Sequence, residues 1–168
     1  TVAAQLRTWL DAGYHPTPIS VNISRVSINN PQIVQVIADI VKKNNIPPSL
    51  FSLEITESAY MDNPEIMTDI VKNFQKNGFT VMMDDFGSGY SSLNTLKNIP
   101  VDILKIDMKF IECDDQEGKG RIILSSVIRM AGWLGMPVIV EGVETEYQAN
   151  FLRAMGCGYI QGYFYARP

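Results

Sequence analysis

Thr80-Val-Met-Met-Asp-Asp85 is a short apolar run that ends in two adjacent carboxylates. A run of this length, rich in residues that suit a pleated surface, indicates a strand buried within a sheet. Five other runs share this form, in which apolar residues are closed by a polar or charged one. They occupy residues 19–24, 51–57, 103–107, 138–142 and 159–162. The chain therefore carries six strand candidates of one kind.

Segments with helical periodicity lie between the strand candidates. They cover residues 2–13, 30–45, 63–78, 93–98, 121–134 and 145–155. The apolar residues expected to face inward on the second and third segments are Ile33, Val34, Ile37, Ile40, Val41, Ile66, Ile70, Val71 and Phe74. Alternation of strands and helices favours a parallel sheet whose strand ends meet on one face. We therefore expect an α/β fold.

The number of strands indicates part of a closed barrel. A complete (β/α)8 barrel has eight strands and typically about 250 residues, whereas this chain offers six strand candidates in 168 residues. We expect one domain over residues 1–168, a partial TIM-like barrel truncated at its N-terminus and also at its C-terminus. Unpaired strand edges would favour self-association.

Composition argues against several classes of function. The net charge is −4 and the pI about 4.9, and no cluster of Lys and Arg suits a nucleic-acid groove, so DNA is not an expected partner. No apolar run reaches the roughly 18 residues of a membrane span. We therefore expect no membrane contact by this segment and a cytoplasmic location, with any anchoring left to other domains of the parent protein. Cys113, Cys157 and the single His15 lack the spacing of a zinc site. The polar run 112–120 predicts a surface loop.

The polar residues that close the strand candidates are expected to converge at one rim, where (β/α) barrels build their active sites. They are Asn22, Glu54, Asp84, Asp85, Lys105, Glu141 and Gln161. Oxygen ligands without His or Cys favour Mg²⁺ or Mn²⁺, with Ca²⁺ able to bind without supporting reaction. Two such ions that share a carboxylate activate water and stabilise the leaving oxygen in phosphodiester cleavage.

Several of these residues also have purely structural interpretations. Asp85 could cap a turn at Gly87 with Asp84 solvated, and Glu54 could lie on an exposed edge strand of alternating polarity. Asp107 could form only a salt bridge or a cap. Asp85-Phe86-Gly87 is also a protein-kinase motif, but the chain has no glycine-rich nucleotide loop and no His-Arg-Asp catalytic loop, which excludes that class.

Six motifs follow one another along the whole chain: Ser20-Val-Asn-Ile-Ser24, Leu53-Glu-Ile-Thr-Glu57, Asp84-Asp-Phe-Gly-Ser-Gly-Tyr-Ser-Ser-Leu93, Leu104-Lys-Ile-Asp107, Glu141-Gly-Val-Glu-Thr145 and Gln161-Gly-Tyr163. Together they resemble EAL domains, the bacterial phosphodiesterases that hydrolyse the second messenger cyclic di-GMP to linear pGpG. The fold that this resemblance implies is the EAL type of TIM-like barrel.

The resemblance also implies roles for individual residues. Asn22, Glu54 and Asp84 would hold a first Mg²⁺ or Mn²⁺ ion, and Asp84 and Asp85 a second, so that Asp84 bridges the two. Lys105 would orient the attacking water, and Glu141 would be the general base or a neighbour of the second metal. Glu144 and Gln161 would line the substrate site. The loop 85–92 would keep its competent shape through Glu57, Phe86 and Gly87.

One departure separates this chain from the family pattern. The Glu-Ala-Leu signature, whose glutamate is a metal ligand, lies upstream of residue 1 in the family, as does an arginine that contacts the substrate phosphate. We therefore expect the isolated chain to be weak or inactive and its parent protein to be active. The expected partners are cyclic di-GMP, a second copy in a homodimer, and GGDEF, PAS or other sensor domains of the parent. The alternative is a receptor that binds cyclic di-GMP without turnover, but the chain keeps both acidic motifs, which favours catalysis.

Overall fold

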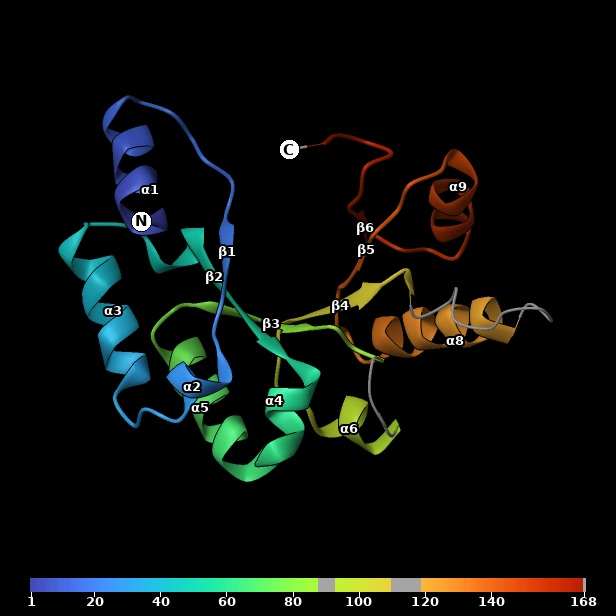
Figure 1. Ribbon diagram of the computed structural model, residues 1–168, viewed down its shortest axis with the longest axis horizontal. Helices are drawn as coiled ribbons and strands as arrows, with labels where there is room; N and C mark the ends of the chain where they lie inside the picture. Colours follow the sequence, from blue (N-terminus) through green and yellow to red (C-terminus); the bar gives the residue numbers. More distant parts are fainter. Residues whose placement is uncertain (88–92, 110–118, 168) are drawn as a thin grey trace. The chain divides into compact units, whose positions relative to one another are not determined.

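The computed structural model describes residues 1–87, 93–109 and 119–167 (Figure 1). Most of the loop predicted at 112–120 and the part of the 85–92 loop from residue 88 onward lie outside the described residues, as does Cys113. By the contacts within the chain, the structure divides into two compact units, Thr1–Met82 and Met83–Pro168. Each unit is described by itself below.

All six predicted strands are present in the structure. They are β1 (Ile19–Asn22), β2 (Phe51–Thr56), β3 (Thr80–Asp84), β4 (Ile103–Asp107), β5 (Val138–Glu141) and β6 (Tyr159–Ile160). They belong to one six-stranded sheet in the order β1-β2-β3-β4-β5-β6. Only β4 has the predicted bounds, and the other five end one or two residues early because their closing polar residues enter the following turn or helix.

The helices among the described residues include two that the periodicity did not predict. The helical elements are α1 (Val2–Asp11), α2 (Arg25–Ile28), α3 (Ile33–Lys43), η1 (Pro48–Leu50), α4 (Glu57–Asp62), α5 (Pro64–Lys76), α6 (Leu93–Asn98), α8 (Lys119–Trp133) and α9 (Glu146–Ala154). The unpredicted α-helices are α2 and α4, and each begins directly after a hydroxyl residue; the short 3-10 helix η1 was not predicted either. Ser24 Oγ accepts the Ser27 N–H, and Thr56 Oγ1 accepts the Ala59 N–H, so both serve as N-caps.

In the first unit, β1 and β2 pair in parallel, with Asn22 opposite Glu54. The largest fully buried side chains of this unit are Leu6, Leu53, Ile55, Met67 and Phe74. Two inward-facing predictions are wrong, since Ile40 is 43% and Ile66 56% exposed. On α5 the buried stripe runs through Met67, Val71 and Phe74, whose spacing of four and three residues fits one helix face.

In the second unit, β4 pairs in parallel with β5, and β5 with β6. Its core contains Met83, Leu104, Ile106, Leu124 and Leu152, all nearly or fully buried. The helix α9 begins with the predicted capping box, in which Thr145 and Gln148 each satisfy the other's backbone N–H. None of the helices in the described ranges has both the length and the apolar character that a membrane crossing requires.

Candidate metal centre

A buried lysine lies between two carboxylates in the second unit. Lys105 Nζ lies 3.0 Å from Asp84 Oδ1 and 3.0 Å from Glu141 Oε2. The three residues come from the adjacent regions β3, β4 and β5, and the exposed fractions of their side chains are 8% for Lys105, 12% for Asp84 and 22% for Glu141. A buried ammonium group is costly unless it is paired, so the two carboxylates account for the position of this lysine. The sequence predicted this pairing of Lys105 with neighbouring acids.

The carboxyl group of Glu141 is electrostatically unlike that of a surface glutamate. Burial raises its pKa above the ordinary value, and the nearby charges of Asp84 and Asp107 add to this rise. The hydrogen bond and positive charge of Lys105 act in the opposite direction without cancelling the effect of burial. Glu141 therefore holds a proton more readily than an exposed glutamate does.

Asp84, the last residue of β3, is followed by an aspartate with an unusual backbone conformation. Asp85 has a φ of 56°, in the left-handed region that few residues other than glycine adopt. Its N–H donates to Asp84 Oδ1 over 3.1 Å. One oxygen each from Asp84, Asp85 and Glu141 lies within 4.8 Å of the others, which forms a candidate metal cluster within the described residues. The donors are all carboxylates, so the cluster suits a hard divalent cation.

A cavity of about 340 Å³ adjoins Glu141. The lining residues include Asp107, Lys109, Glu141, Glu144, Gln161 and Tyr163. Glu144 and Gln161, two residues expected at the substrate site, thus share one cavity with Glu141. Lys109 and Tyr163 were not predicted for it, although Tyr163 directly follows the Gln161-Gly162 pair of the last motif.

Asp107 makes the backbone cap and the ion pair expected of a residue with a structural role. Its Oδ1 accepts the Lys109 N–H over 2.8 Å, and its Oδ2 lies 4.0 Å from Lys109 Nζ. It is also the β4 register partner of Glu141. Asp107 therefore caps the chain after β4 while contributing negative charge beside Glu141.

Main-chain hydrogen bonds hold Gln161 close to the end of β5. The Gln161 N–H donates to the Val140 carbonyl over 2.8 Å, and the Val143 N–H donates to the Gln161 carbonyl over 3.1 Å. The Phe164 N–H in turn donates to the Val143 carbonyl over 3.0 Å. A Cβ atom at Gly162 would overlap the Val143 backbone, so this close approach requires glycine.

The remaining predicted residues lie on β1 and β2 or shortly after β2 and β3. Asn22 is exposed, whereas Glu54 is 6% and Glu57 2% exposed, which excludes the exposed-edge interpretation of Glu54. Glu57 is the first residue of α4, where the positive end of the helix dipole favours a carboxylate. Phe86 is buried, and its N–H donates to the Lys105 carbonyl over 3.1 Å. Gly87 has a φ of 96°.

Comparison with known protein families gives a match over the full chain. The family model described as EAL domain matches residues 1–168. Among curated relatives, the signaling protein YkoW of Bacillus subtilis is 37% identical over 98% of this chain and 20% of its own length. The bifunctional diguanylate cyclase/cyclic di-GMP phosphodiesterase MucR of Pseudomonas aeruginosa is 35% identical over 98% of this chain and 24% of its own length. The chain thus spans only a fifth to a quarter of these relatives.

Solved structures give the same result. The PaMucR phosphodiesterase in complex with c-di-GMP superposes with a TM-score of 0.90 at 34% identity, covering 99% of this chain and 67% of that one. A manganese/cy-diGMP complex of Klebsiella pneumoniae BlrP1 superposes with a TM-score of 0.85 at 28% identity, covering 99% of this chain and 42% of that one. These matches confirm the predicted fold class, a partial barrel of the EAL type with parallel strands and flanking helices. The chain belongs to the EAL domain family.

Proposed function

We propose that this chain is the cyclic di-GMP phosphodiesterase part of a longer signalling protein, and that the parent hydrolyses cyclic di-GMP to linear pGpG. The observation that carries the proposal is the buried array of Asp84, Lys105 and Glu141, with the Asp85 carboxylate close by. Family membership supports it, because the MucR relative is described as a cyclic di-GMP phosphodiesterase and the PaMucR structure holds c-di-GMP.

Two Mg²⁺ or Mn²⁺ ions are the proposed cofactors. Asp84 and Asp85 are the proposed ligands in the second unit, since both are oxygen donors and their carboxylates lie close together, with Glu141 beside them as the proposed base. Asn22 and Glu54 are proposed as further ligands from the family resemblance, and the manganese complex of BlrP1 supports a divalent ion. When bound, such ions activate water and offset the charge of a phosphodiester.

Within this proposal, the protein's own residues orient the reactants and move the proton. Lys105 holds the attacking water and offsets negative charge on the phosphate, since its ammonium group is already positioned between Asp84 and Glu141. Glu141 takes the proton from that water, and its raised pKa makes it a better base than an exposed glutamate. Glu144 and Gln161 orient the substrate from the adjoining cavity.

The further domains, the location and the oligomeric state of the parent protein are also part of the proposal. Because the chain spans about a fifth of the length of YkoW and a quarter of that of MucR, we assign the parent additional sensor or GGDEF-type domains. A cytoplasmic location and a homodimer fit a domain that acts on a soluble second messenger. Glu57, Phe86 and Gly87 are proposed to shape the loop after β3.

The test is an assay of the parent protein and of the isolated chain with cyclic di-GMP and either Mg²⁺ or Mn²⁺, with products separated by ion-exchange chromatography. We expect pGpG from the parent, little or none from the isolated chain, and loss of product in Glu141→Gln of the parent. Absence of product from the parent with both ions, while cyclic di-GMP still binds, would instead support the receptor. Absence of binding as well would overturn both functions.

A further inference from the structure

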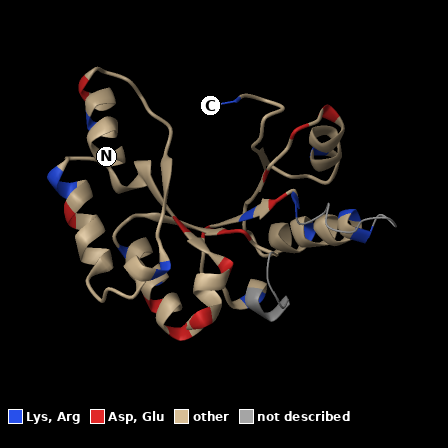
Figure 2. Ribbon diagram, in the orientation of Figure 1, with Lys and Arg blue, Asp and Glu red and all other residues tan. Residues whose placement is uncertain are grey.

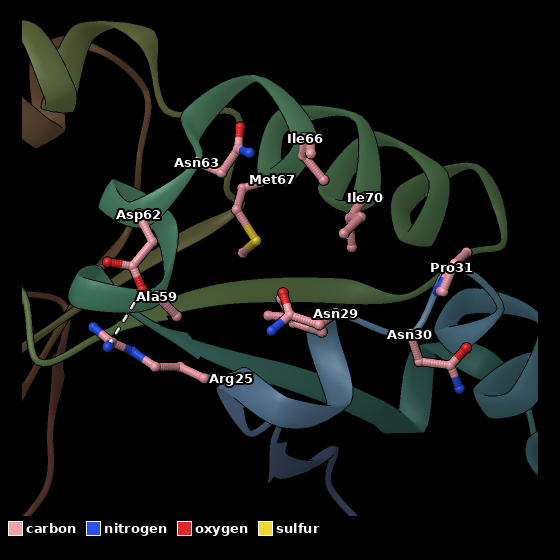
Figure 3. A pocket seen from close by; sticks show the side chains of 11 residues that line it. Arg25, Asn29, Asn30, Pro31, Ala59, Asp62, Asn63, Ile66, Met67 and Ile70 are labelled. Atoms are coloured by element: carbon pink, nitrogen blue, oxygen red, sulfur yellow. Dashed lines mark ion pairs between the residues drawn. The ribbon is translucent and has the colours of Figure 1, made fainter.

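A second cavity lies in the first unit, between α2 and α5 (Figure 3). It measures about 370 Å³, within the range of small-molecule sites. Its apolar lining residues are Ile28, Ala59, Ile66, Met67 and Ile70. Ile28, Ala59 and Met67 are buried, whereas Ile66 is 56% exposed. No residue of the proposed metal centre or substrate site lines this cavity.

One end of the cavity carries two opposite charges. Arg25 Nη1 lies 3.3 Å from Asp62 Oδ2, and Figure 3 shows the two side chains facing each other there. Both are more than half exposed, at 55% and 63%. Such a pair contributes little to stability and is easily rearranged. The Asn29 amide lies farther along the cavity, below Met67 (Figure 3).

We propose that this cavity binds a free α-amino acid with a branched or aromatic apolar side chain. The ligand's carboxylate would accept hydrogen bonds from the Arg25 guanidinium, which has five N–H donors. Its ammonium group would donate to Asp62, and its side chain would lie against Ile66, Met67 and Ile70. The ligand therefore matches both the charges and the apolar wall.

Charge complementarity selects this class over simpler ligands. A fatty acid or a phosphate would pair with Arg25 but would be repelled by Asp62. A simple amine would pair with Asp62 but would be repelled by Arg25. Figure 2 shows both acidic and basic residues on α5 and a basic one on α2, and the charged residues that line the cavity are Arg25 and Asp62, so its lining carries no net charge. A zwitterion satisfies both members of the pair at once.

Size and exposure support the same class. At about 370 Å³ the cavity lies near the small end of the range for ligand sites, which suits a ligand the size of one amino acid. The exposed part of Ile66 would be covered by the ligand's side chain, which removes apolar surface from water. Glycine offers the same charges without that burial, so it serves as the decisive analogue.

The experiment is an isothermal titration of the full 168-residue chain with L-leucine and L-phenylalanine. Three analogues each remove one feature of leucine: 4-methylpentanoate lacks the ammonium group, 3-methylbutylamine lacks the carboxylate, and glycine lacks the side chain. We expect saturable binding of leucine or phenylalanine, and affinities at least about tenfold weaker for each analogue. Equal affinity of 4-methylpentanoate and leucine, or the absence of saturable binding by both amino acids, would overturn the proposal.

Variants test the two charges directly. Arg25→Gln and Asp62→Asn should each weaken leucine binding by at least about tenfold, and both positions are exposed, so folding is expected to be unaffected and is checked by circular dichroism. The matched controls are Asp69→Asn on α5 and Arg129→Gln on α8, exposed charges that do not line the cavity. We expect both controls to bind leucine as the unchanged chain does. Unaltered binding in Arg25→Gln would contradict the assignment.

Discussion

At the scale of single residues, Lys105 is the residue on which the buried charges depend. Replacing it by methionine would leave Asp84 and Glu141 facing each other without a cation. Breaking a buried ion pair by removing one partner costs about 3–5 kcal/mol, so we expect Lys105→Met to lower the free energy of unfolding by that order in the absence of metal. Urea unfolding in EDTA measures this loss.

The same variant also reports on the acidic cluster. Because Mn²⁺ can offset the two carboxylates, adding it should restore part of the stability lost in Lys105→Met. Lys97→Met, an exposed change on α6, should lose little stability with or without the ion. A Lys105→Met chain that is equally stable in EDTA and Mn²⁺ would show that these acids do not bind the cation.

The raised pKa of Glu141 predicts how the stability of the chain depends on pH. Its pKa is raised in the folded chain, mainly by burial, above the ordinary value of 4.5. At pH values between the ordinary pKa of 4.5 and the raised pKa, the folded state binds more protons than the unfolded state. The free energy of unfolding therefore falls as pH rises through this range, and it levels off above the raised pKa. In metal-free buffer, Glu141→Gln should remove this part of the fall. Glu144→Gln, an exposed change near the same cavity, should leave the slope unchanged, and an unaltered slope in Glu141→Gln would contradict the prediction.

At the scale of secondary-structure elements, Gly162 determines how closely β6 follows the end of β5. A methyl group there would overlap the Val143 backbone, and overpacking of this kind costs about 1–3 kcal/mol. We expect Gly162→Ala to destabilise the chain by that amount and to speed hydrogen exchange of the Val143 and Phe164 amides. Gly158→Ala is the matched control, since a Cβ there would meet nothing within 4 Å. Equal stability of the two variants would disprove the role of Gly162.

The elements also show how far the sequence predicts this structure. The strands were predictable because each is a continuous apolar run with a polar end. The helix α2 was missed because it is four residues long, about one turn, which is too short for a helical period to register. The helix α4 was missed because its first residue, Glu57, was assigned to the strand run 51–57. The stripe on α5 was misassigned because apolar residues occupy more than one face, and only packing selects Met67 over Ile66. The left-handed Asp85, which places its carboxylate in the cluster, has no sequence signal apart from the glycines that follow it.

At the scale of the whole molecule, the proposed metal ligands are divided between the two compact units. Asn22 and Glu54 are register partners in the first unit, whereas Asp84, Asp85 and Glu141 form the acidic cluster of the second. Neither unit, taken by itself, requires an ion that both units bind. The proposed function does, because it assigns Glu54 of the first unit and Asp84 of the second to the same ion.

A double-mutant cycle between Glu54→Gln and Asp84→Asn tests this requirement. At a concentration of Mn²⁺ one hundred times its dissociation constant, binding should stabilise the unchanged chain by about 2.7 kcal/mol. We expect each single variant to lose most of that gain and the double variant to lose no more than either, because ligands of one ion are energetically coupled. Glu65→Gln, an exposed change on α5, should keep the full gain. Thermal unfolding with Mn²⁺ and with EDTA supplies the four values. Strictly additive losses, or a Glu54→Gln chain that Mn²⁺ stabilises in full, would mean that Glu54 does not bind the ion held by Asp84.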